Sequence, residues 1–182
     1  DWCVSRQRVW GVPLPIFISK KDDKVLVDEE VFSNIAYIFE KEGSDCWFED
    51  NKQKFLGKKY NENDYYQTTD IVEVWFDSGS THSFVLEQRD DLKWPASLYL
   101  EGSDQHRGWF HSSLLESCGT RGEAPFEAIL SHGFVVDGKG LKMSKSLGNV
   151  ISPEEILKKY GADILRIWVA ASNYAEDLRI DH

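Results

Sequence analysis

The chain of 182 residues is long enough for one domain with a real core, and its 41% hydrophobic content, with seven Trp and seven Tyr, argues against a disordered protein. Acidic side chains outnumber basic ones by 31 to 21, which gives a formal net charge of -10. Because phosphate contacts need a basic face, this balance argues against a chain that binds nucleic acid by itself, although a local basic pocket remains compatible with it.

The cysteines, the hydropathy and the first residues indicate where the chain is located and whether it belongs to a longer protein. Cys3, Cys46 and Cys118 form no Cys-x-x-Cys pair, so the sequence supports neither a zinc ribbon nor a disulfide framework, and we expect a reducing, cytoplasmic location. No run approaches the roughly 20 apolar residues of a membrane span, so we expect no membrane partner. The chain begins with Asp1-Trp2-Cys3, inside structured-looking sequence, which indicates a piece of a longer protein.

The N-terminal part contains one clear helix. Residues 14–19 and 25–28 alternate around a charged tip, which predicts a β-hairpin. Residues 31–42 then show helical spacing, and Gly43 follows as a helix end. The apolar face of this helix is expected to consist of Val31, Ile35, Ile38 and Phe39.

The next segment is harder to assign. Residues 44–70 are polar and irregular with few core candidates, which is typical of a connective insertion. Residues 71–76 are a short apolar run that predicts a strand, ended by Asp77-Ser78-Gly79.

From Ser97 onward the pattern is strand, turn and helix. Residues 97–100 predict a buried strand, and residues 128–136 predict a second one. The helix between them is expected to bury an apolar stripe made of Trp109 or Phe110, Leu114, Leu115 and Cys118. Such units predict a parallel α/β sheet, in which ligands collect at the carboxyl ends of the strands.

Two helices are expected near the C-terminal end. Ser152 as N-cap, Pro153 at the first helical position and Glu155 three residues after the serine form a capping box. Gly161 ends this helix. A second helix over residues 162–171 is expected to turn inward the residues Ile164, Leu165, Trp168 and Val169.

Charged and polar residues crowd the turn after the first of these strands. Glu101 and Asp104 are carboxylates that can accept from ribose hydroxyls or from an ammonium group, and Gln105 adds an amide. Gly102 allows close approach of the backbone. Helix capping by Ser103 or Asp104 explains single residues, but the whole cluster favours a site.

Two histidines and one tryptophan also have both a structural and a functional interpretation. His106 and His111 lack a carboxylate or Cys at matching helical spacing, so we expect no metal site. Trp75 ends a strand candidate, and core packing explains a tryptophan there more often than contact with a ligand does.

Two lysines stand in a glycine-rich segment between the second strand and the capped helix. Gly138, Gly140 and Gly148 give this segment freedom, so that Lys142 and Lys145 can swing onto a polyphosphate. Contacts that form only as charge builds at the reacting phosphate lower a barrier without tightening ground-state binding. A solvated surface loop explains the composition equally well.

Four blocks in a fixed order resemble class I aminoacyl-tRNA synthetases. Residues 142–146 read Lys-Met-Ser-Lys-Ser, the KMSKS signature of that family, and the other blocks are residues 2–13, 74–79 and 101–109. The resemblance is greatest to the isoleucine-specific branch of bacterial or organellar type. The valine and leucine branches share the KMSKS block and resemble residues 74–82 and 101–109 less closely.

The resemblance implies an α/β fold and a division of the chain. The expected fold is the C-terminal half of a Rossmann-like parallel-sheet nucleotide-binding catalytic domain, with a small connective insertion, followed by the start of a helical stem region. Residues 1–19 are expected to return into the catalytic domain after a missing editing insertion, and residues 20–70 to form the connective insertion. Residues 71–151 are expected to form the second half of the Rossmann-like catalytic domain with the KMSKS loop, and residues 152–182 a helical stem-contact region. The family's His-Ile-Gly-His signature is absent, so we expect the chain alone to be inactive. We also expect it to be monomeric or weakly self-associating.

The resemblance also implies a reaction. The full-length enzyme is expected to join isoleucine to ATP with Mg²⁺ and to transfer the aminoacyl group to tRNA(Ile), without a protein-bound zinc. Lys142 and Lys145 are the implied catalytic residues, with Lys145 engaging ATP. Trp75 and Trp109 are implied to wall the amino-acid pocket. The implied residues around the aminoacyl-adenylate are Glu101, Gly102, Asp104 and Gln105.

Other interpretations stay open at this point. The chain is also compatible with a non-catalytic nucleotide- or partner-binding module, or with another nucleotidyl transferase of the superfamily, although the latter does not explain the Trp-rich blocks. A valine- or leucine-specific synthetase of the same class is a further alternative. Isoleucine and valine differ by one methylene, which is worth only about 1–3 kcal/mol in an apolar pocket.

Overall fold

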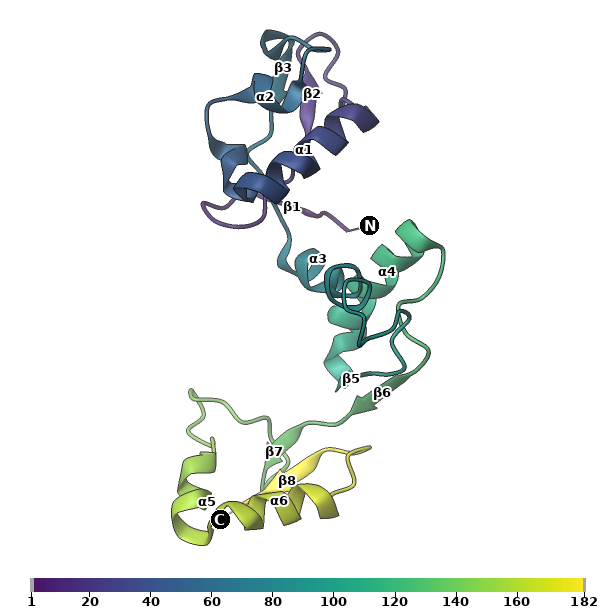
Figure 1. Cartoon of the computed structure of the whole chain (residues 1–182). Coiled ribbons are helices and arrows are strands. Elements are labelled where there is room, and N and C mark those ends of the chain that lie inside the picture. The colour runs from purple at the N-terminus through teal and green to yellow at the C-terminus, as the bar shows by residue number, and fades with distance from the viewer. Residues whose placement is uncertain (1, 182) are drawn as a thin grey trace. The chain divides into compact units, whose positions relative to one another are not determined.

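A computed structural model describes residues 2–181 and divides them into two compact units, residues 2–78 and residues 79–181 (Figure 1). Paired strands are antiparallel in the first unit and parallel in the second. The chain is therefore a mixed α/β protein, and the predicted fold class is confirmed at this level. The predicted segment boundaries at residues 19, 70 and 151 stay predictions.

The first unit contains short elements around one long helix. Its elements are β1 (Ser5–Arg6), β2 (Phe17–Ser19), α1 (Glu29–Glu42), the 3₁₀ turn η1 (Ser44–Phe48), α2 (Lys52–Leu56), the 3₁₀ turn η2 (Glu62–Asp64), β3 (Tyr65–Gln67), β4 (Ile71–Val72) and the start of α3 (Val74–Gly79). Strand β1 pairs with β4, and β2 pairs with β3, in the registers Ser5↔Val72 and Phe17↔Gln67.

The predicted N-terminal hairpin is only partly correct. A single bridge joins Ile18 to Val25, and the Ser19 N–H donates to the Lys24 carbonyl at 2.8 Å. The main partner of β2 is β3, more than forty residues along the chain. Alternation along a strand predicts its two faces, but it carries no information about a distant partner.

Helix α1 is confirmed, and its inward residues Val31, Ile35 and Ile38 are all buried. Asp28 caps it, because its side chain accepts from the backbone N–H groups of Glu30 and Val31. The same carboxylate accepts hydrogen bonds from Lys59 and from the Tyr60 hydroxyl, so it ties the start of the helix to a distant loop.

The expectation that residues 44–70 hold few core side chains is wrong. Trp47 is 0% exposed and lies at the centre of the core, with its ring 5.0 Å from Phe17 and 4.9 Å from Phe55. Its indole N–H donates to the Thr68 carbonyl at 2.8 Å, which satisfies its one polar group. The apolar residues of this segment are few but large, and η1 and α2 turn them to the same side. The full cluster is Phe17, Val31, Ile35, Ile38, Cys46, Trp47, Phe55 and Leu56.

The strand predicted over residues 71–76 ends early. Only Ile71 and Val72 pair with β1, and the chain then turns into α3. The cause is Glu73, which is 8% exposed and accepts the Trp75 N–H at 3.0 Å, so that it acts as a cap for the helix.

The second unit contains the parallel strands. Its elements are the π-helical turn η3 (His82–Leu86), β5 (Tyr99–Gly102), the 3₁₀ turn η4 (Ser103–Arg107), α4 (Trp109–Arg121), β6 (Ile129–His132), β7 (Val135–Asp137), α5 (Pro153–Tyr160), α6 (Ala162–Ala171) and β8 (Leu178–Ile180). Strands β5 and β6 are parallel with α4 between them, as predicted. The single strand predicted over residues 128–136 is divided at Gly133, and β7 pairs in parallel with β8, a strand that the sequence did not reveal.

The predicted stripe of α4 is wrong in most of its members. Phe110, Ser113 and Ser117 face inward, whereas Leu114, Leu115 and Cys118 are exposed. The two serines can be buried because their hydroxyl groups form hydrogen bonds. Ser113 Oγ lies 3.0 Å from the Tyr99 hydroxyl, and Ser117 Oγ donates to the Glu123 carbonyl at 2.8 Å. The small serine side chains let α4 lie close to the strand that carries Tyr99.

The two C-terminal helices form as predicted, at Pro153–Tyr160 and Ala162–Ala171. Ser152 caps α5 by accepting the Glu154 N–H. In α6, Leu165 and Trp168 are half-buried, but Ile164 and Val169 are exposed. Ile164, Leu165 and Trp168 line an open groove of about 250 Å³ against α5 and β8, and are not enclosed. No helix within residues 2–181 is both long and apolar enough to cross a membrane.

Candidate active site

Strand β5 ends at Gly102, opposite His132 at the end of β6, and the turn η4 follows at once. A Cβ atom at position 102 would lie 2.8 Å from Asp104 Oδ1. Glycine is therefore what lets the Asp104 carboxylate fold back over the end of the strand. Glu101 and Asp104 are both exposed at this carboxyl end of the parallel pair, where the topology of α/β sheets favours ligands.

Gln105 connects this turn to α4. Its Oε1 accepts the Trp109 backbone N–H at 2.8 Å, and its Nε2 donates to Asp104 Oδ2 at 3.1 Å. Gln105 thus holds the first helical N–H group and orients the neighbouring carboxylate. Capping by Ser103 or Asp104, the simpler interpretation of these residues, is not observed, because the cap residue of α4 is Gly108, without a side-chain cap bond.

Trp109 is the first residue of α4 and lies flat on Tyr99. Their ring centroids are 4.2 Å apart with an angle of 9° between the planes. Tyr99 is 4% exposed, and burial raises the pKa of its hydroxyl, whose partner is Ser113. One face of the Trp109 indole is therefore fixed by packing, and Trp109 as a whole is half-buried.

The structure brings five predicted residues together: Glu101, Gly102, Asp104, Gln105 and Trp109 all belong to β5, η4 or the first turn of α4. Trp75 is in the first unit, 42% exposed on α3. Its pairing with Trp109 in a pocket stays a prediction. His106 and His111 are exposed, and among residues 2–181 no three His, Cys, Asp or Glu side chains gather as a metal site requires.

The second candidate region is the lysine loop, residues 138–149. After β7 the chain makes a tight turn in which the Asp137 N–H donates to the Leu141 carbonyl at 2.9 Å and Val136 bridges to Lys142. Gly140 has φ of +80°, a left-handed conformation that favours glycine at this position of a short turn.

Lys142 and Lys145 are exposed, and within the described part of the chain neither ammonium group forms an ion pair. Their backbone is nevertheless held. The Lys142 carbonyl accepts from Asn149 Nδ2 at 3.2 Å, and the Lys145 carbonyl accepts the Gly148 N–H at 3.3 Å. The two positive charges thus extend from a structured loop into solvent, which leaves them available to an anion.

Sequence reasoning missed two residues that shape this loop, Asp137 and Asn149. Both have side chains that hydrogen-bond to the loop backbone. The available signal was the pair Asp137-Gly138 at one end and Gly148-Asn149 at the other, because Asp and Asn beside Gly commonly organise turns through their side chains.

Residues 1–181 match the model of the family described as tRNA synthetases class I (I, L, M and V). The chain belongs to this family. The resemblance that the four sequence blocks indicated is thereby confirmed.

The similarity of this class I synthetase chain to its relatives extends over its whole length. It is 79% identical over 182 residues to the isoleucine--tRNA ligase of Pelagibacter ubique (strain HTCC1062), with 100% of this chain and 20% of that protein covered. It is 58% identical over 181 residues to the isoleucine--tRNA ligase of Brucella abortus biovar 1 (strain 9-941), with 99% of this chain and 18% of that protein covered. The synthetase chain therefore spans about a fifth of the length of these curated relatives.

A solved structure supports the fold. The synthetase chain matches the crystal structure of the ternary complex of Agrobacterium radiobacter K84 agnB2 LeuRS-tRNA-LeuAMS with a TM-score of 0.66 and 20% identity, over 99% of this chain and 25% of that chain. At this identity the likeness concerns the fold, and it agrees with the predicted α/β class.

Proposed function

We propose that the chain is part of an isoleucine–tRNA ligase. In the full-length protein the isoleucine carboxylate attacks the α-phosphorus of ATP, the bond to the β-phosphate breaks, and pyrophosphate leaves. A ribose hydroxyl at the 3′ end of tRNA(Ile) then attacks the carbonyl carbon of the adenylate, an ester forms, and AMP leaves. The observation that carries the proposal is the 79% identity, over every residue of this chain, to a protein of that name.

Lys145, with Lys142 helping, is proposed to act on the triphosphate. Mg²⁺ enters with ATP as part of the substrate. Negative charge builds on the pyrophosphate as the bond breaks, and positive groups that meet it there stabilise the transition state more than the ground state. Exposed lysines that form no ion pair among residues 2–181, on a loop with fixed backbone, suit this role, because no ion-pair partner within these residues has to be released first.

The turn after β5 is proposed to hold the adenylate. Glu101 and Asp104 supply acceptors for ribose hydroxyls or for the isoleucine ammonium group, and Gly102 lets the ligand approach the backbone. Gln105 keeps Asp104 oriented through the hydrogen bond at 3.1 Å. Trp109, with one face held by Tyr99, is proposed to offer its remaining surface to the amino-acid side chain. Free cysteines at positions 3, 46 and 118 support a reducing, cytoplasmic location as part of this proposal.

Amino-acid-dependent exchange of pyrophosphate into ATP tests the proposal. The full-length protein should catalyse exchange fastest with isoleucine, more slowly with valine, and not with leucine. The 182-residue chain alone should show no exchange above background. Preference for leucine or valine, or exchange that is independent of any amino acid, would contradict the proposal.

A further inference from the structure

Asp137 is a buried carboxylate at the base of the lysine loop, 9% exposed. Its Oδ1 accepts the backbone N–H groups of Lys139 at 2.9 Å and of Leu141 at 2.8 Å, and its Oδ2 accepts from Asn149 Nδ2 at 2.8 Å. The hydrogen bonds from Asn149 and from the Leu141 N–H lower the pKa of this carboxyl, which keeps it ionised as a strong acceptor.

Asn149 joins the two ends of the loop. Besides donating to Asp137, its Nδ2 donates to the Lys142 carbonyl at 3.2 Å, and its Oδ1 accepts the Ser144 N–H at 2.9 Å. One amide side chain therefore contacts the backbone on both sides of Met143 and the carboxylate at the start of the loop.

The glycines alone suggest a loop that is free to move, but these side chains give it a fixed base. Ser144 Oγ accepts the Leu147 N–H at 3.3 Å, and the Gly148 N–H donates to the Lys145 carbonyl at 3.3 Å, so the loop backbone is also linked internally. What stays free is the pair of long lysine side chains. Because the Cα positions of the two lysines are already fixed, less conformational entropy is lost when the ammonium groups bind a phosphate.

We propose that Asp137 and Asn149 are positioning residues that hold the backbone of Lys142 and Lys145 in place for reaction with the triphosphate. This inference rests on the proposed function. It assigns to neither residue a contact with substrate. Asp137 and Asn149 act through the loop, and their hydrogen bond to each other is the central link.

The hydrogen bond between them can be broken and restored by exchanging the two residues. Asn149→Asp places two carboxylates against each other and removes both donations of the amide. Asp137→Asn combined with Asn149→Asp restores one donor and one acceptor across the pair with the wild-type net charge. Asn63→Asp is the matched control, because Asn63 is exposed and its side chain makes no hydrogen bond within the described residues.

In the full-length protein, Asn149→Asp should lower the rate of isoleucyl-adenylate formation by ~tenfold or more, with the affinity for isoleucine unchanged. The exchanged pair should recover most of that rate, and Asn63→Asp should match the wild type. A wild-type rate in Asn149→Asp would overturn the proposal, as would an exchanged pair no faster than Asn149→Asp. A loss of rate and isoleucine affinity together, without rescue, would indicate a merely structural effect.

Hydrogen exchange of the same proteins separates this proposal from the proposed function. Amides of residues 139–149 should exchange faster in Asn149→Asp and return toward wild-type protection in the exchanged pair. Unchanged protection would overturn the positioning role even if the enzyme is an isoleucine ligase. If the wild type shows no isoleucine-dependent activity, the proposed function fails, and the protection pattern still decides whether the two side chains hold the loop. If Asn149→Asp does not fold, Asn149→Ala removes the same donor without adding a charge and gives the same readouts.

Discussion

The aromatic core of the first unit and the lysine loop of the second are both well ordered, but different forces hold them. Around Trp47 the order comes from buried rings, with Phe17 and Phe55 within 5.0 Å between centroids. In the lysine loop it comes from polar side chains, Asp137 and Asn149, that bond to backbone groups. Five consecutive residues of that loop, 138–142, are exposed.

This difference predicts how the two regions respond to substitution. Buried apolar area contributes directly to the free energy of unfolding, whereas a typical hydrogen bond contributes only about 1 kcal/mol of net stability and restricts conformation. Substitutions in the core should lower stability, and substitutions in the loop should lower the reaction rate.

The largest expected effect is on stability, from Trp47→Ala. Removing a fully buried indole leaves a cavity and an unpaired Thr68 carbonyl, and should lower the free energy of unfolding by about 3–5 kcal/mol. Denaturant unfolding of the chain measures this. Trp10→Ala is the control, because Trp10 is 88% exposed and its removal should change stability by less than ~0.5 kcal/mol. Equal losses in the two variants would contradict the assignment of the core.

Much of the fold was accessible from the sequence where local signals and tertiary packing agree. The capped helices α1 and α5, the helix α6 and the parallel pair around α4 belong to this group. The failures lie where packing depends on a distant partner. The pairing of β2 with β3 and the existence of β8 required residues far along the chain. In α4, periodicity favoured leucines over serines because the Tyr99 hydroxyl that satisfies Ser113 was not visible.

The residues of the candidate site also divide into those that the sequence predicted and those that it did not. Motifs pointed to Glu101, Gly102, Asp104 and Gln105, and the structure brings these residues together at the end of β5. The roles of Asp137 and Asn149 could not be read from the sequence, because the hydrogen bond between them spans twelve positions and depends on how the loop closes.

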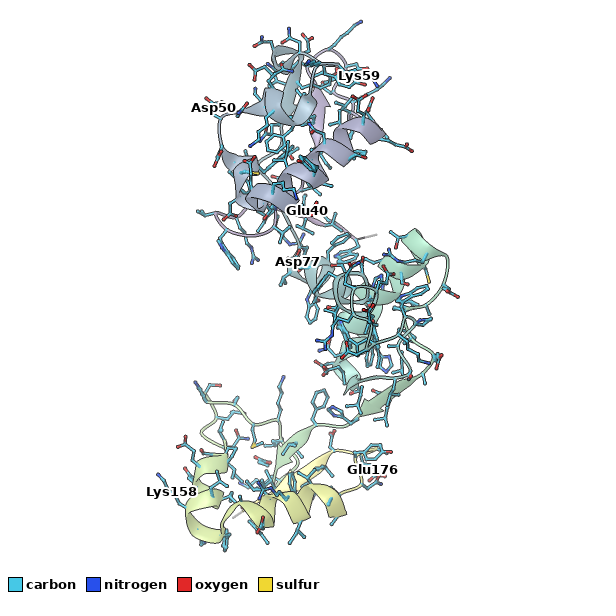
Figure 2. The ribbon with its side chains drawn as sticks, viewed as in Figure 1. Glu40, Asp50, Lys59, Asp77, Lys158 and Glu176 are labelled. Atoms are coloured by element: carbon cyan, nitrogen blue, oxygen red, sulfur yellow. The ribbon has the colours of Figure 1, made fainter. Side chains whose placement is uncertain are left out.

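A smaller effect is expected from Lys142→Ala. We propose that the charge of Lys142 assists that of Lys145, so its loss should lower the rate of adenylate formation by about tenfold without a change in stability. Single-turnover kinetics of the full-length protein measure the rate. Lys158→Ala, on the exposed surface of α5 (Figure 2), should retain the wild-type rate. A lowered rate of adenylate formation in Lys158→Ala would mean that the loss of any positive charge, and not the position of Lys142, lowers the rate.

The smallest expected effect is on how the stability of the fold depends on pH. Hydrogen bonds from Lys59 and Tyr60 lower the pKa of Asp28 in the folded state. A lowered pKa adds stability above the unfolded value of about 3.9, and this contribution is lost as the pH falls below it. Asp28→Asn should therefore be less stable than wild type at pH 7, with a difference that shrinks below pH ~4. Thermal unfolding across this range tests the prediction. Asp50→Asn, at an exposed position (Figure 2), should follow the wild type at every pH.

We propose that the lysine loop acts on the triphosphate and not on the binding of isoleucine. Lys145→Ala in the full-length protein tests this directly, with the rate of adenylate formation and the affinity for isoleucine measured side by side. We expect the rate to fall by ~100-fold or more, while the dissociation constant for isoleucine stays within about twofold of wild type. An equal loss in rate and affinity, or an unchanged rate, would contradict it.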